Sequence, residues 1–127
     1  MECVMQFNGI QLAAILKAAQ LMSIADGKTE KSEVEFIASE FNSFNVDKDQ
    51  FAAILKAAEV MEAEDMVKAL SSLDSSQKKY VCGFLAVIIL SDGDVDESEV
   101  KMWQLLCTMC KFPTMTVKDA MAYYANN

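Results

Sequence analysis

Two segments of the chain resemble each other closely enough to indicate an internal duplication. The first reads IADGKTEKSEVEFI over residues 24–37, and the second reads LSDGDVDESEVKMW over residues 90–103. In each copy an apolar helix is expected before the Asp-Gly pair, and an amphipathic helix that contains the Ser-Glu-Val triplet is expected after it. Two repeats are too few to stack into a solenoid. The sequence therefore predicts one closed bundle built on two pseudo-symmetric helix–acidic loop–helix units.

Capping boxes indicate where several of the helices begin. In such a box a polar side chain accepts a hydrogen bond from the backbone N–H three positions later, and the residue there bonds back to the first backbone N–H. The expected pairs are Asn8 with Gln11, Asp47 with Gln50, Asp74 with Gln77, Asp96 with Glu99 and Thr116 with Asp119.

Apolar residues recur with the 3.6-residue period of a helix in the intervals between these starts. Helices are expected over residues 11–25, from about residue 30, after residue 47, over residues 64–72 and 75–90, after residue 96, and over residues 117–124. The segment over residues 75–90 is apolar nearly all round, which predicts a central position. The predicted fold class is all-α: a compact bundle of about seven helices in a single domain spanning residues 1–127.

Charge and hydropathy exclude several classes of partner. The formal net charge is −8, from 19 acidic and 11 basic residues. This charge repels phosphate backbones and anionic lipids, so we expect neither a nucleic-acid partner nor a membrane partner. No segment reaches the ~18–20 apolar residues that span a bilayer, and the opening MECVMQFNGI lacks the features of a secretory signal. We therefore expect a cytoplasmic protein whose four cysteines are free thiols.

The acidic residues of the two repeated loops are the candidate metal ligands. They are Asp26, Glu30 and Glu33 in the first loop, and Asp92, Asp94, Asp96 and Glu99 in the second. A standard EF-hand is excluded, because the two earlier ligand positions are apolar in both copies, as at Ile88 and Leu90. The remaining oxygen atoms predict only weak binding of calcium, magnesium or manganese. In the alternative interpretation these acids only cap helices and oppose their dipoles, which contributes ~0.3–1 kcal/mol each.

The repeated residues resemble the signature of the TerB-like family, in which an apolar helix ends in Ala-Asp-Gly and is followed by acidic residues and Glu-Val. The resemblance covers most of the chain from about Leu12 onward. It implies a compact bundle of about seven helices in a bacterial cytoplasm, with an acidic surface proposed to hold metal ions. It also implies a role in stress response, such as tellurite resistance, or in protein interaction, without an established catalytic activity. Lys28 and Lys31 depart from this pattern, because they lower the negative charge of the first loop.

No catalytic function is expected for this chain. It contains no histidine, which removes the Ser-His-Asp and Cys-His arrangements. Cys107 and Cys110 form a Cys-x-x-Cys motif, but both lie on the apolar stripe of a predicted helix. We interpret them as buried core thiols.

The sequence is best interpreted as a TerB-like, stress-associated interaction module that has a protein partner and binds a divalent cation weakly. Two other functions are left open: a metal-dependent hydrolase that uses the paired acidic loops, and a structural subunit that does not respond to cations. Formation of a homo-oligomer is also left open, because Tyr123 and Tyr124 are compatible either with packing or with a contact between copies.

Overall fold

The computed structural model describes residues 7–24, 37–41, 46–90 and 97–126. Every regular element in these residues is a helix, which confirms the predicted all-α fold. The helices are α1 (Gly9–Ser23), α3 (Lys48–Val60), α4 (Ala63–Ser71), α5 (Ser75–Ile89), α6 (Glu97–Met109) and α7 (Val117–Ala125), and residues 37–41 are helical as well. None of the described helices combines the length and the apolar character that crossing a bilayer requires. Most of both acidic loops lies outside the described residues, so their pseudo-symmetry stays a prediction.

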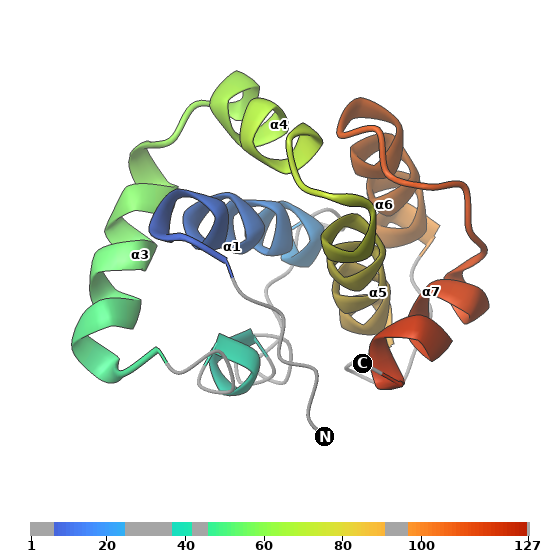
Figure 1. The fold of residues 1–127 in the computed structure, drawn as a ribbon, viewed down its shortest axis with the longest axis horizontal. Helices are drawn as coiled ribbons and strands as arrows, with labels where there is room; N and C mark the ends of the chain where they lie inside the picture. Colours follow the sequence, from blue (N-terminus) through green and yellow to red (C-terminus); the bar gives the residue numbers. More distant parts are fainter. Residues whose placement is uncertain (1–6, 25–36, 42–45, 91–96, 127) are drawn as a thin grey trace.

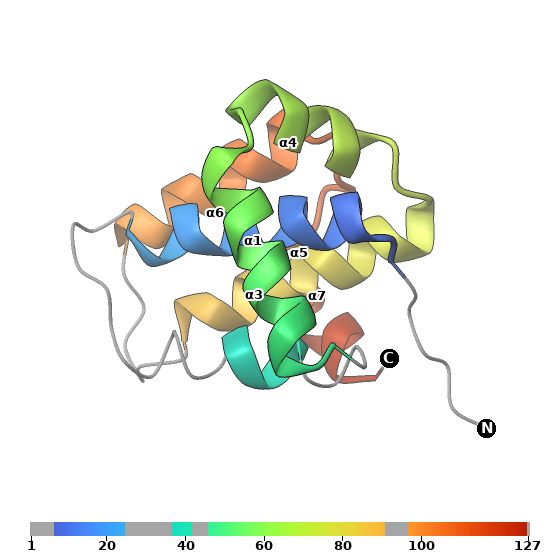
Figure 2. The ribbon, with the colours of Figure 1, turned by 90° about the vertical axis from the view of Figure 1, so that its left-hand side faces the viewer.

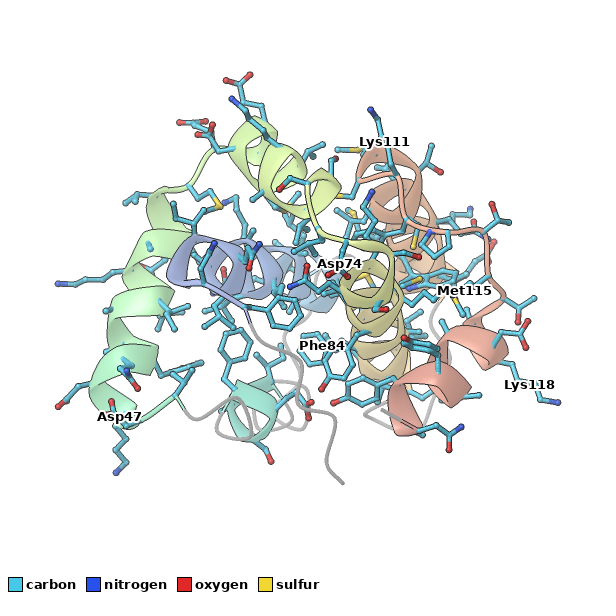
Figure 3. All side chains as sticks on the ribbon, viewed as in Figure 1. Asp47, Asp74, Phe84, Lys111, Met115 and Lys118 are labelled. Atoms are coloured by element: carbon cyan, nitrogen blue, oxygen red, sulfur yellow. The ribbon has the colours of Figure 1, made fainter. Side chains whose placement is uncertain are left out.

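The beginnings of four helices follow the capping pattern. The side chains of Asn8, Asp47 and Asp74 each accept a hydrogen bond of 2.8 Å from the backbone N–H of a glutamine three residues later, and that glutamine bonds back. Figure 3 labels Asp47 and Asp74 at the starts of α3 and α5. Thr116 accepts at 3.0 Å from the N–H three residues later. These four predicted starts are confirmed, and the fifth, at Asp96, lies outside the described residues.

Helix α1 lies in the middle of the bundle. Figures 1 and 2 show it surrounded by other helices, and it packs against α3, α4, α5 and α6. Its buried residues are Leu12, Ala13, Ala14, Ile15, Leu16, Ala18, Ala19 and Met22. Three of these buried residues, Ala13, Ala14 and Ala18, are alanines. Because alanine side chains are small, these positions let neighbouring helices approach α1 from several directions.

Helix α5 is also central, as its apolar sequence predicted. Its residues from Tyr80 to Ala86 are all buried, and its most extensive packing is against α7. A Cβ atom added at Gly83 would overlap the carbonyl oxygen of Ala120 and would lie 2.6 Å from the Cβ of Tyr124. The glycine is therefore required by the close approach of two helices.

The helical residues 37–41 close the bundle between α3 and α5 (Figure 1). Ile37 and Phe41 are buried. The Phe41 ring packs edge-on against Phe51 of α3, with ring centroids 5.6 Å apart. On the other side, the Tyr80 hydroxyl of α5 donates a hydrogen bond of 2.9 Å to a carboxylate oxygen of Glu40. This short segment is thus fixed to α3 by an aromatic contact and to α5 by a polar one.

Candidate functional site

One of the seven predicted metal ligands, Glu99, falls within the described part of the chain. The six that lie outside the described residues are Asp26, Glu30, Glu33, Asp92, Asp94 and Asp96. Within the described residues, no group of three or more histidine, cysteine or acidic side chains is arranged to hold a metal ion. The structure therefore places Glu99 and leaves the assembly of the two acidic loops as a prediction.

Glu99 stands in the first turn of α6, and its side chain is 1% exposed. It is the buried charged residue of the described core, and both of its carboxylate oxygens are shielded from solvent. Glu99 has interaction partners within the fold. Because an ionised carboxylate is costly to remove from water, its burial requires hydrogen bonds, an opposite charge, a cation or a proton.

Glu97, two residues earlier on the same helical turn, provides a contrast. Its side chain is 85% exposed and forms an ion pair of 3.4 Å with Lys101, four residues later. Surface pairs of this kind contribute little to stability. Two acids in the first turn of α6 thus occupy opposite environments. The acidic run in the sequence shows where such residues cluster, but it cannot show which carboxylate faces inward.

The cysteines form a second group with chemical potential. Cys82 and Cys110 are buried and Cys107 is partly exposed, all three as free thiols. The Sγ atoms of Cys82 on α5 and Cys107 on α6 are 3.6 Å apart. Burial was predicted for Cys107 and Cys110 and is confirmed for Cys110, whereas Cys107 is only partly buried. Cys107 of the motif thus contacts a thiol on another helix, which the Cys-x-x-Cys spacing alone does not indicate.

The environments of the three thiols shift their ionisation differently. The hydrogen bond with Cys107 lowers the pKa of Cys82, while burial acts in the opposite direction. That same hydrogen bond, followed by burial, raises the pKa of Cys107. The hydrogen bond between the two sulfurs therefore favours a single negative charge on the pair, located on Cys82. Burial raises the pKa of Cys110 to about 11, although the Lys78 ammonium opposes this shift.

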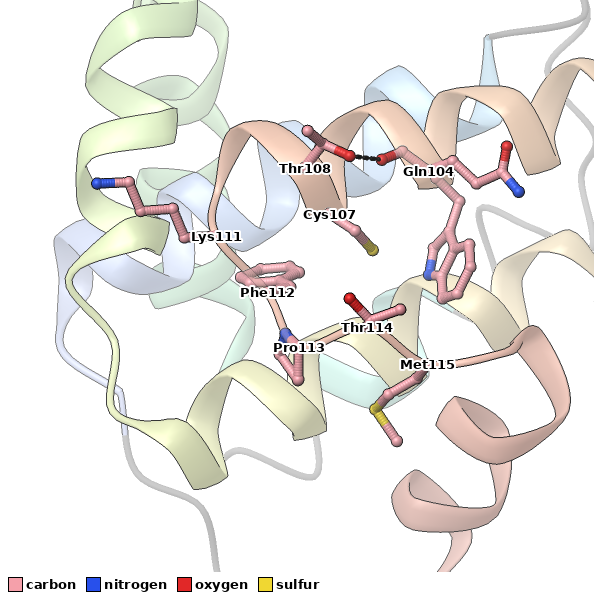
Figure 4. Close-up of a pocket in the computed structure, with 9 residues that line it drawn as sticks. Gln104, Cys107, Thr108, Lys111, Phe112, Pro113, Thr114 and Met115 are labelled. Atoms are coloured by element: carbon pink, nitrogen blue, oxygen red, sulfur yellow. Dashed lines mark hydrogen bonds between the residues drawn. The ribbon is translucent and has the colours of Figure 1, made fainter.

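A pocket of about 360 Å³ opens beside Cys107, where α6 ends and the chain turns toward α7. Figure 4 shows the Cys107 sulfur among the side chains that line this pocket, which include Trp103 and Phe112. Lys111, at the turn after α6, has a positive φ of 58°. The left-handed conformation at this residue reverses the chain direction before Pro113, so that residues 112–115 form the opposite wall of the pocket.

An apolar groove of about 320 Å³ lies between α1 and α3. It is lined by Gly9, Ile10, Ala13, Ala53, Ile54, Ala57 and Met61. Ile10 is 68% exposed, and Val60, beside Met61 in the sequence, is 80% exposed. The Lys17 ammonium donates to the Ala58 carbonyl at 3.4 Å and ties the two helices together. Exposed apolar side chains gathered around a groove are typical of protein interaction surfaces.

Comparisons with known proteins agree with this architecture. A family model described as "Tellurite resistance protein TerB" matches residues 10–122. The chain is also similar to a crystal structure of a protein of unknown function from Porphyromonas gingivalis W83, with 40% sequence identity and a TM-score of 0.84. That similarity covers 98% of this chain and 100% of the other. No curated protein matches the chain.

Proposed function

Because this chain belongs to the TerB family of tellurite resistance proteins, we propose that it is a non-enzymatic interaction module of the bacterial cytoplasm that binds a divalent cation weakly. The observation that carries the cation proposal is the burial of Glu99 at the beginning of α6. The module acts in tellurite resistance or a related stress response, and cation binding stabilises the folded chain.

The chemistry of the donors determines the class of ion. The acidic loop contributes Asp92, Asp94 and Asp96 in the sequence directly before α6, and Glu99 follows within the first turn. All of these donors are carboxylate oxygens, which favour calcium, magnesium or manganese over softer metals. A divalent cation would offset both the repulsion among these acids and the cost of burying the Glu99 carboxylate. It would therefore bind the folded chain in preference to the unfolded chain.

The interaction part of the proposal is supported by the apolar groove between α1 and α3. Ile10 exposes apolar surface at this groove, and the acidic residues Glu59 and Glu62 lie close to its lining residue Met61 in the sequence. With a net charge of −8 on the chain, the surface suits a protein partner that presents apolar side chains with a basic border. We propose such a partner as the occupant of the groove.

A comparison of Glu99→Gln with Glu97→Gln tests the cation site, because it removes one carboxylate charge from a buried position and one from an exposed position of the same helical turn. Loss of the cation-dependent rise in melting temperature in Glu99→Gln alone supports the proposal. Turnover of a phosphodiester substrate with magnesium or manganese would instead contradict its non-enzymatic part.

A further inference from the structure

Two thiols from different helices meet inside the bundle. The Sγ atoms of Cys82 and Cys107 are separated by 3.6 Å. A disulfide bond has an S–S length near 2.05 Å, so bond formation requires an approach of about 1.5 Å. The partner helices α5 and α6 pack directly against each other. The geometry thus places a potential disulfide within a small side-chain movement.

Trp103 holds the two helices together at this level. Its indole Nε1 donates a buried hydrogen bond of 2.9 Å to the carbonyl oxygen of Cys82. Trp103 precedes Cys107 by one helical turn, so both side chains extend from the same face of α6. The backbone carbonyl of Cys82 therefore accepts a hydrogen bond from Trp103, while the Cys82 thiol contacts Cys107 on the same face of α6. This arrangement restrains the relative positions of the two sulfurs.

The two thiols differ in their access to solvent. Cys107 is partly exposed and lines the pocket of about 360 Å³ at the end of α6 (Figure 4). Cys82 and Cys110 are both 0% exposed. A small reagent that enters the pocket therefore reaches Cys107 first. Cys82 lies behind it, in contact with the sulfur that would be modified.

We propose that Cys82 and Cys107 form a dithiol site that reacts with small hydroperoxides and closes to a disulfide between α5 and α6. The Cys82 thiolate takes the proton of Cys107 across their 3.6 Å contact, and the Cys107 sulfur attacks one peroxide oxygen. The O–O bond breaks, and the departing oxygen takes a proton and leaves as an alcohol or as water. Cys107 is then a sulfenic acid. The Cys82 sulfur attacks the Cys107 sulfur, which releases the hydroxyl group as water. Two thiols are oxidised by two electrons in total, and the peroxide is reduced by two.

The ionisation of the pair supports this sequence of steps. The thiolate is the reactive form of cysteine. Each thiol can donate its hydrogen to the other sulfur across the 3.6 Å contact, and the resulting hydrogen bond favours a single negative charge on the pair. The pair retains its second proton, because the pKa of Cys107 is raised beside Cys82. The negative charge of the pair therefore lies on Cys82, which can accept the Cys107 proton as Cys107 attacks and can then resolve the sulfenic acid.

Peptide mapping after exposure to hydrogen peroxide tests this site. The full chain is used with Cys3→Ser, which removes a fourth thiol that could react independently. After mild oxidation the remaining thiols are alkylated and the disulfide-linked peptides are quantified by mass spectrometry. We expect the Cys82–Cys107 link in at least about tenfold excess over links that contain Cys110, because the folded chain holds the first pair in contact. The same treatment in urea should remove this preference.

Two variants separate the roles of the thiols. Cys110→Ala removes another buried thiol of α6 and should leave the yield of the Cys82–Cys107 link within about twofold of the parent, because Cys110 takes no part in the reaction. Cys82→Ala should abolish the link and leave Cys107 as a sulfenic acid that a dione reagent traps. If Cys107 stays unmodified in the native parent chain, or if its disulfides in that chain form equally with Cys82 and Cys110, the proposal is wrong. Because both of these outcomes are measured on the parent chain, they test the dithiol site even if a variant folds poorly.

Discussion

The hydroxyl of Tyr80 on α5 donates a hydrogen bond of 2.9 Å to Glu40, in a helical segment that precedes it by forty residues. The Tyr80 ring also packs against Tyr124 of α7, with ring centroids 5.0 Å apart. Tyr80 is 8% exposed. Burial, followed by the hydrogen bond to Glu40, raises the pKa of Tyr80. One phenol thus joins three segments of the bundle and must keep its proton in the folded state.

Stability should therefore fall in alkaline solution. The unfolded chain begins to lose the Tyr80 proton near pH 10, whereas the folded chain retains it above that pH, so the free energy of unfolding decreases as pH rises beyond about 10. The Tyr80 contribution to this slope approaches about 1.4 kcal/mol per pH unit. Urea unfolding of Tyr80→Phe between pH 8 and 11 should show a shallower decline than the parent chain. Tyr123→Phe is the matched control, and an equal change in both variants would contradict the assignment to Tyr80.

Gly83→Ala should destabilise the fold although alanine favours helices. A Cβ atom at this position would overlap the Ala120 carbonyl oxygen and crowd Tyr124, so α7 must move away from α5. We expect a loss of about 1–3 kcal/mol after the gain in helix propensity of about 1 kcal/mol is included. Gly9→Ala is the control, because a Cβ there meets nothing within 4 Å. Thermal unfolding of both variants measures the difference, and similar melting temperatures would show that α5 and α7 are not so closely packed.

Asp47→Ala should weaken the beginning of α3. The substitution removes the oxygen that accepts from the Gln50 N–H at 2.8 Å, and loss of an N-cap costs about 1 kcal/mol. Asp47→Asn retains an acceptor oxygen and should cost much less. Chemical denaturation of the two variants distinguishes the hydrogen bond from a general effect of the negative charge. Equal losses for alanine and asparagine would mean that the charge, and not the cap, stabilises this helix.

The helices could be predicted from the sequence because their signals are local. Capping pairs such as Asp74 with Gln77 place a helix start within a residue, since both partners lie within one turn. The burial of Ala13 and Ala18 could not be predicted, because alanine carries too weak an apolar signal to mark a face. The pairing of Cys82 with Cys107 could not be predicted either. It depends on the rotation of two helices against each other, which no spacing within one helix encodes.

At the candidate site too, the sequence does not indicate which acidic side chain packs against the core. The spacing of the acids indicated both a cap and a ligand role for Glu99, and Glu97 was not among the predicted ligands. The structure separates them, because Glu99 faces the core with 1% exposure while Glu97 pairs with Lys101 at the surface. This distinction arises from how α6 packs against α1 and α5. Glu99 and Glu97 can therefore be compared in an experiment as a buried and an exposed carboxylate of one helical turn.

The most direct test of the cation proposal is the melting temperature of the parent chain, Glu99→Gln and Glu97→Gln in calcium, magnesium or manganese at constant ionic strength. With a partial set of ligands we expect a dissociation constant no tighter than ~10⁻⁴ M. An ion concentration of ~100 times that constant should stabilise the parent chain by about 2.7 kcal/mol, which raises the melting temperature by several degrees. Glu97→Gln should keep this rise, and Glu99→Gln should lose most of it. A parent chain whose melting temperature does not respond to any of the three ions would contradict the proposal and leave the acids as helix caps.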